Sequence, residues 1–281
     1  PGRRMAPHPL GSSQGGGERG VITQIWQWLT APEQWSGSRG IPTRLLEHLG
    51  FSALSLLLAA AIAIPVGLWV GHTGRGRSVV TIANAARAVP SLGLLFAVAM
   101  FVGPRITSNL AFVIPSVVVL VLLAIPPLLS GADSGVRSVD PAVRDAAYGM
   151  GMTGREVLWR VELPCALPLL LSGVRAATLQ VIATATIAAA VSLGGLGRYL
   201  IDGLAVSDYA QMAGGAILVA ALALALDGLL ALAQRLLVSP GLATRPSQRR
   251  HGKFPRARGV AGGRGRVLAP AALTTHGRDL T

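Results

Sequence analysis

Several residue types on which enzymes depend are scarce in this chain of 281 residues. It contains one cysteine, Cys165, and one lysine, Lys253. A single cysteine excludes an internal disulfide and a cysteine-cluster metal site. Because Lys253 lies in HGKF, outside any G-x-x-x-x-G-K-[ST] pattern, the chain has no P-loop of its own. Its five histidines are scattered without an H-E-x-x-H motif, so we expect neither a metal site nor an enzyme.

Two short patterns resemble enzyme motifs but lack the structural context that those motifs need. Residues 149–154 spell G-x-G-x-x-G, yet no strand precedes them and no βαβ unit surrounds them. Residues 11–15 spell G-x-S-x-G inside a low-complexity stretch with no strand-to-helix turn to expose the serine. We therefore expect no dinucleotide cofactor and no serine nucleophile.

Charge is also scarce, and long apolar runs take its place. Charged residues make up 13% of the chain, hydrophobic residues 51%, and the mean hydropathy is +0.55, which is too apolar for an ordinary soluble domain. The run from Leu49 to Val70 has no charge and as a helix would be about 33 Å long, enough to cross a bilayer. We expect an all-α integral membrane protein with about five transmembrane helices, from apolar stretches at about 49–70, 79–103, 107–130, 169–193 and 212–234.

Composition divides the chain into three parts. Residues 1–40 are expected to be disordered and interfacial, because 21–35 carries three tryptophans around a short apolar patch. Residues 41–238 form the transmembrane domain. Residues 239–281 are expected to be a disordered basic tail that contacts membrane lipid, since the arginines there have no aromatic interleaving that would indicate nucleic-acid binding.

The distribution of arginine predicts an orientation in the cell (plasma or inner) membrane. Lys and Arg favour cytoplasmic loops. Four arginines lie between the third and fourth spans and two between the first and second, whereas the other two loops hold one each. With the basic tail, this pattern predicts an N-terminus outside and a C-terminus in the cytoplasm. The arginines of the N-terminal segment do not fit this pattern.

Three ionisable residues lie in or near the spans: Arg87, Arg175 and Asp227. Each would cost about 2.5–3.5 kcal/mol at a helix centre facing lipid, so each should face protein, water or an interface. Snorkelling accounts for the two arginines, which lie near expected cytoplasmic ends. The alternative places these three residues, with Pro90, in a translocation path or a subunit interface, and an Arg–Asp pair stays open.

The interval 131–168 is a polar stretch with its own helix signals. Asp140 followed by Pro141 predicts an N-cap and a first helical residue, with the helix ending near Met150 and Gly151. Thr153 and Glu156 are spaced as a capping box that opens a second short helix. Pro164 is expected to end that helix. Such a pair of short helices suits a docking surface.

Within this interval the spacing of residues resembles a known motif. Asp145-Ala146-Ala147, three residues, Gly151, nine residues and Val161-Glu162-Leu163-Pro164 resemble the EAA loop of binding-protein-dependent ABC importer permeases, with Asp for Glu and Val for Ile. The flanking segments RAVPSLGLLF, DPAVRDAAYGMGMT, ELPCALPLLLSGVRAAT and SLGGLGRYLIDGL resemble the branch that imports glycine betaine, choline and carnitine. The resemblance covers about residues 41–238.

This resemblance implies a permease bundle that is used in pairs, with each loop seated in a groove of a cytoplasmic ABC ATPase. It implies that Ala146, Ala147 and Gly151 form the surface of close approach, and that Asp145 orients the loop. It further implies that Val161, Leu163 and Pro164 anchor the loop to the bundle. The partner ATPase would use the ATP, a second permease of the same or a paralogous sequence would complete the pair, and an extracytoplasmic binding protein would deliver the solute.

The expected function is therefore an ABC importer permease for osmoprotectants. An importer of amino acids such as methionine, with the same architecture, is an alternative. A self-contained channel or connector protein is a third reading, and recovery of an ATPase with the chain would separate it from the first two.

Overall fold

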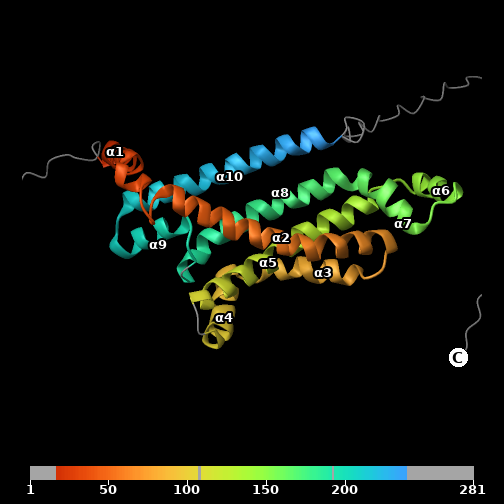
Figure 1. Ribbon diagram of the computed structural model, residues 1–281, viewed down its shortest axis with the longest axis horizontal. Helices are drawn as coiled ribbons and strands as arrows, with labels where there is room; N and C mark the ends of the chain where they lie inside the picture. Colours follow the sequence, from red (N-terminus) through yellow and green to blue (C-terminus); the bar gives the residue numbers. More distant parts are fainter. Residues whose placement is uncertain (1–16, 107–108, 192, 239–281) are drawn as a thin grey trace, which may run out of the picture. The chain divides into compact units, whose positions relative to one another are not determined.

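The computed structural model describes residues 17–106, 109–191 and 193–238, shown as coloured ribbons in Figure 1. The chain divides into residues 1–243 and 244–281. The second unit lies outside the described residues, as do the low-complexity residues 11–15 and the tail expected at 239–281. Every regular element in the described ranges is helical, which confirms the expected all-α class.

Four helices, or five if a bent pair counts as one span, are long and apolar enough to cross a membrane. Three are single helices, α2 (Ile41–Thr73), α5 (Val113–Arg137) and α10 (Tyr209–Leu237). The fourth runs from Gly154 to Val191 and contains α8 (Leu163–Ala188). Their positions confirm the expected number of about five spans.

The apolar stretch at 79–103 was expected to be one helix, and this expectation is wrong. It forms α3 (Arg77–Ala85), the 3-10 turn η2 (Ala86–Ala88) and α4 (Ser91–Val102). The two halves meet at an angle of 97°, and Figure 1 shows α4 turned away from α3. The cause is Pro90, which has no N–H to donate and pushes Val89 into extended backbone, at φ −71° and ψ 127°.

Helices α2, α5 and α8 pack together through small residues (Figure 1). A Cβ atom on Gly67 of α2 would lie 2.7 Å from the Cβ of Ala132 in α5. Between α5 and α8, a Cβ on Gly131 would lie 2.9 Å from the Cα of Gly173. Such distances leave no room for a side chain, so glycine sets the separation of both helix pairs. The largest fully buried apolar side chains of the core cluster are Leu95, Leu120, Leu128, Leu129 and Leu193.

The N-terminal tryptophans lie on α1 (Gly17–Thr30) and the short turn η1 (Pro32–Trp35). Trp28 packs edge-on against Tyr199 of α9 (Gly197–Val206), with ring centroids 5.1 Å apart. The Tyr199 hydroxyl donates to the Arg39 carbonyl at 2.7 Å. Helix α1 therefore packs against α9 through Trp28, in addition to having a composition suited to the membrane interface. The remaining 3-10 turns are η3 (Gly103–Arg105), η4 (Asn109–Ala111) and η6 (Ala189–Val191).

The polar interval lies at the end of the bundle where α2 and α5 finish and α3 and α8 begin, which we call the loop end (Figure 1). It contains α6 (Pro141–Gly149), α7 (Gly154–Val157) and the π-helical segment η5 (Leu158–Glu162). The arginines that guided the predicted orientation gather at this end: Arg75, Arg77, Arg137, Arg144, Arg155 and Arg160.

Candidate functional site

Helix α6 begins and ends as its sequence predicts. The Asp140 carboxylate accepts a hydrogen bond from the Ala142 N–H at 2.9 Å, so the expected N-cap is confirmed. At the other end Gly151 has φ +85°. Its N–H donates to the Tyr148 carbonyl at 2.9 Å, and the Met152 N–H donates to the Ala147 carbonyl at 3.2 Å. This pair of bonds is a Schellman ending, which requires the left-handed backbone that glycine adopts without strain.

The second helix begins with the expected capping box. The Glu156 N–H donates to the Thr153 hydroxyl at 3.4 Å, and the Thr153 N–H donates to the Glu156 carboxylate at 2.9 Å. Both halves of the motif are present, so this prediction is confirmed. Two capped helix ends, one on each side of Gly151, fix the angle at which the loop turns.

Pro164 does not end the second helix, and the expected break there is wrong. The chain passes from α7 through η5 into α8 without interruption. In η5 the Leu163 N–H donates to the Leu158 carbonyl, five residues earlier. Widening the turn at this point places Pro164 in the first turn of α8, where its missing N–H costs little. The second half of the loop, from Gly154 onward, is therefore one continuous helix with span four.

The outer surface of the loop carries exposed apolar side chains. The exposed fractions are 47% for Val143, 72% for Met150 and 54% for Trp159. Asp145, Ala146 and Gly151 of the same loop are exposed as well. A shallow hollow of about 410 Å³ adjoins this surface, lined by Thr153, Arg155, Glu156, Trp159 and Arg160. Large apolar side chains exposed on a polar loop are typical of a protein contact surface.

The inner surface of the loop packs on the bundle. Ala147 is 2% exposed and Val157 is fully buried, so Ala147 does not share the outer face with Ala146. Leu163 packs against a small cluster at the ends of α2, α5 and α8. Val161 is half-buried and Pro164 is exposed.

A buried carboxylate links three elements, and sequence reasoning missed it. Glu162 is 1% exposed. One carboxylate oxygen lies 2.6 Å from Nδ1 of His72, at the end of α2, and the other lies 2.9 Å from Nε of Arg144, on α6. Arg144 also donates to the Val136 carbonyl of α5. The one available signal was a charged residue in the apolar run V-E-L-P, because its partner His72 is 90 positions away.

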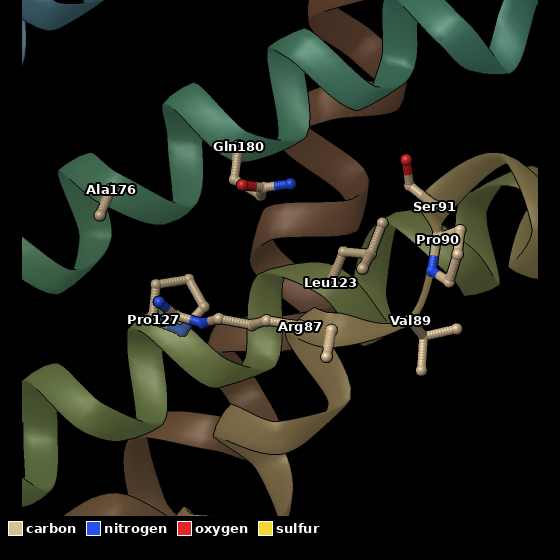
Figure 2. Close-up of a pocket in the computed structure, with 9 residues that line it drawn as sticks. Arg87, Val89, Pro90, Ser91, Leu123, Pro127, Ala176 and Gln180 are labelled. Atoms are coloured by element: carbon tan, nitrogen blue, oxygen red, sulfur yellow. The ribbon is translucent and has the colours of Figure 1, made fainter.

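The other predicted residues lie along the spanning helices, where Arg87 and Pro90 are exposed and Arg175 and Asp227 are partly buried. Arg175 of α8 forms a two-bond ion pair with Asp227 of α10, the pairing that the sequence left open. Arg87 and Pro90 are separate from this pair and line a cavity of about 400 Å³. The cavity lies where the broken span meets α5 and α8, and Figure 2 shows the Arg87 side chain extended from η2 towards Pro127. No group of three or more His, Cys, Asp or Glu in the described ranges is arranged to hold a metal ion.

Comparisons with known proteins place this geometry in context. Residues 63–243 match the family described as binding-protein-dependent transport system inner membrane component. The chain is 32% identical over 199 residues to the choline transport system permease protein OpuBB of Bacillus subtilis, covering 70% of this chain and 88% of that protein. The glycine betaine/carnitine/choline transport system permease protein OpuCB of the same organism is 31% identical over the same coverage.

Among solved structures, the fold is similar to a chain of the MetNI methionine ABC transporter in an inward-facing conformation. The TM-score is 0.65, and the match covers 75% of this chain and 100% of that chain. Sequence identity is 21%, so this likeness concerns the fold alone.

Proposed function

The chain belongs to the family of binding-protein-dependent transport system inner membrane components, and we propose that it is the permease of an ABC importer for osmoprotectants such as glycine betaine, carnitine and choline. The support for this solute class is the pair of relatives at 31–32% identity that are named for these solutes. Methionine, the sequence-based alternative, has only a likeness of fold in its favour.

The observation that carries the mechanism is the capped loop at 140–164, with an apolar outer face and a buried inner face. In our proposal the outer face, with Asp145, Ala146 and Gly151, docks in a groove of a cytoplasmic ABC ATPase. Ala147, Val161 and Leu163 hold the loop to the bundle, and Pro164 lies at the start of α8. A small exposed alanine beside a glycine allows close backbone approach, and the apolar neighbours give area to bury.

Two features would transmit movement of the docked loop into the bundle. The helix runs without a break from Gly154 into α8. Glu162 ties that helix to His72 of α2 and to Arg144 of α6. Because packed elements move as rigid bodies, closure of the ATPase would displace α2 and α8 together and change access to the bundle interior.

The arginines of the loop end favour the orientation proposed from sequence. Six of them gather at this end, so we place it in the cytoplasm. The C-terminal end of α10 then lies in the cytoplasm and the N-terminus outside. The complete importer would contain two permeases, two ATPase subunits and an extracytoplasmic binding protein that delivers the solute.

The test is purification from the native membrane in mild detergent, followed by reconstitution of what is recovered. We expect an ABC ATPase and a solute-binding protein to accompany the chain. In proteoliposomes the complex should take up radiolabelled glycine betaine or carnitine only with ATP. Uptake of methionine alone would contradict the solute class, and ATP-independent flux by the chain alone would favour the channel reading.

A further inference from the structure

Arg87, which is exposed on this single chain, differs from Arg175 and Asp227, the other two charged residues that the sequence places in or near the spans. Arg175 and Asp227 neutralise each other across α8 and α10. Arg87 makes no ion pair with any residue that the structure describes, and no acidic side chain is among the residues that line its cavity. A charged group within a membrane span persists where it has a partner or a function. Its partner is therefore to be sought outside the described residues.

The cavity lies near the middle of two membrane-spanning helices. It is lined by Leu123 and Pro127, close to the middle of α5, and by Ala176 and Gln180, in the central part of α8. This placement does not match the snorkelling expected for Arg87. A lipid phosphate lies at the membrane surface and would not reach this depth. A volume of about 400 Å³ is in the range of small-molecule sites.

Polar groups from α4, α5 and α8 add to the polar character of the cavity. Because Pro127 has no N–H, the carbonyl of Leu123 has no helical partner. Helix α4 begins at Ser91, after Pro90, and no side chain caps it. Its first N–H groups therefore make no hydrogen bond to a capping side chain. Figure 2 shows the Gln180 side chain reaching from α8 into the same space. Interrupted helices that line a cavity are a general way to place polar groups within a membrane.

We propose that Arg87 binds the carboxylate of a zwitterionic solute in this cavity, so that the importer favours carboxylate-bearing osmoprotectants over choline. This inference rests on the proposed function and names the solute class within it. A guanidinium pairs with a carboxylate through two parallel hydrogen bonds. The same charge repels choline, which is a cation without a carboxylate. No aromatic side chain is among the lining residues, so a cation–π contact does not offset that repulsion.

The first experiment measures equilibrium binding to the permease–ATPase complex in nanodiscs without the binding protein. The probe is radiolabelled glycine betaine, competed by carnitine, acetate or choline. We expect carnitine and acetate to displace it and choline to fail at the same concentration. Arg87→Gln should weaken binding at least about tenfold, the effect of losing a charged hydrogen bond, and Arg87→Lys should restore part of it. Arg77→Gln, on the same broken span, is the matched control and should bind as the wild type does.

The outcomes of the binding experiment separate the alternatives. Equal binding by the wild type and Arg87→Gln would overturn the proposal, as would the absence of binding to the wild type. If choline displaced the probe as strongly as carnitine does, the proposal would also be overturned, because the charge of Arg87 would then not discriminate between the two solutes.

The second experiment measures uptake and ATP hydrolysis in the reconstituted importer with its binding protein. Arg87→Gln should lower glycine betaine uptake about tenfold while receptor-stimulated ATP hydrolysis stays within about twofold. Loss of uptake and hydrolysis together would overturn the proposal, since it would indicate a structural role. A wild-type complex that transports none of these solutes would instead refute the proposed function, while the binding measurement still decides the role of Arg87.

Discussion

Replacing Glu162 with glutamine should loosen the docking loop from the bundle without changing the loop's outer surface. Glutamine keeps the shape of the side chain but removes the charge that faces His72 and Arg144. A hydrogen bond to a charged group contributes about 1.5–3 kcal/mol, and breaking a fully buried pair costs about 3–5 kcal/mol. His72 and Arg144 keep 19% and 24% of their side chains exposed, so water reaches both. We therefore expect the substitution to lower the free energy of local loop opening by about 2–3 kcal/mol, within the range for a hydrogen bond to a charged group.

A cost of this size would raise the population of the detached loop about 30- to 150-fold. Hydrogen exchange in residues 140–164 and at the end of α2 should quicken by a similar factor, because exchange follows local opening. Uptake should fall while assembly with the ATPase persists, since the outer face is unchanged. Glu33→Gln, the same substitution at an exposed position of η1, is the control and should leave exchange and uptake unchanged.

A double-mutant cycle with Arg144→Gln isolates the pair from the individual residues. If the two groups act together, the double variant should cost less than the sum of the single variants, because no charge is left without its partner. Strict additivity, or wild-type exchange in Glu162→Gln, would refute the view that this carboxylate holds the loop.

Three further predictions follow from the geometry. Gly151→Ala should destabilise the loop by about 1–2 kcal/mol, the cost of a left-handed backbone for a residue with a Cβ. Bulky replacements of Gly151 should abolish uptake while membrane insertion stays intact. The control Gly149→Ala, in open space with helical backbone, should be tolerated in an uptake assay. Asp140→Ala should remove the N-cap of α6 at a cost of about 1 kcal/mol, seen as faster exchange confined to that helix. Arg175→Gln and Asp227→Asn should each lower the temperature of detergent unfolding, and the double variant should be more stable than either single one, because it leaves no unpaired charge.

The sequence allowed the apolar spans and the helix caps to be predicted because both depend on neighbouring residues. The N-cap at Asp140 and the capping box at Thr153 are formed within four residues of chain. The packing of Gly67 and Gly71 of α2 against α5 joins residues that lie far apart in the sequence, so local patterns do not predict it. The structure shows that a Cβ at either position would meet α5.

The effect of the prolines in and next to the spans could not be predicted, because it depends on what surrounds the helix. Pro65 lies inside α2 and Pro126 inside α5 without ending either helix. Pro90 breaks its span, whereas the helix continues through Pro164 after the π-helical turn η5. The freed carbonyls find other partners or line a cavity, according to the packing of neighbouring helices. The same limit applies to Glu162, whose partner His72 comes from another helix.

Helix α8 connects the loop at 140–164 with the cavity beside Arg87. Glu162 lies immediately before its first residue, and Gln180 lies on the cavity 18 residues later, about 27 Å along a helix axis. Between them Arg175 ties the same helix to α10. A rigid helix that moves at one end must also move at the other, unless it bends. Displacement of the docking loop would therefore shift Gln180 relative to Arg87, which is carried by the broken span and not by α8. In the proposed mechanism, ATP-driven closure would change the distance between Gln180 and Arg87, which both line the cavity. The affinity of the cavity for a bound carboxylate would then change although the ATPase does not contact the solute.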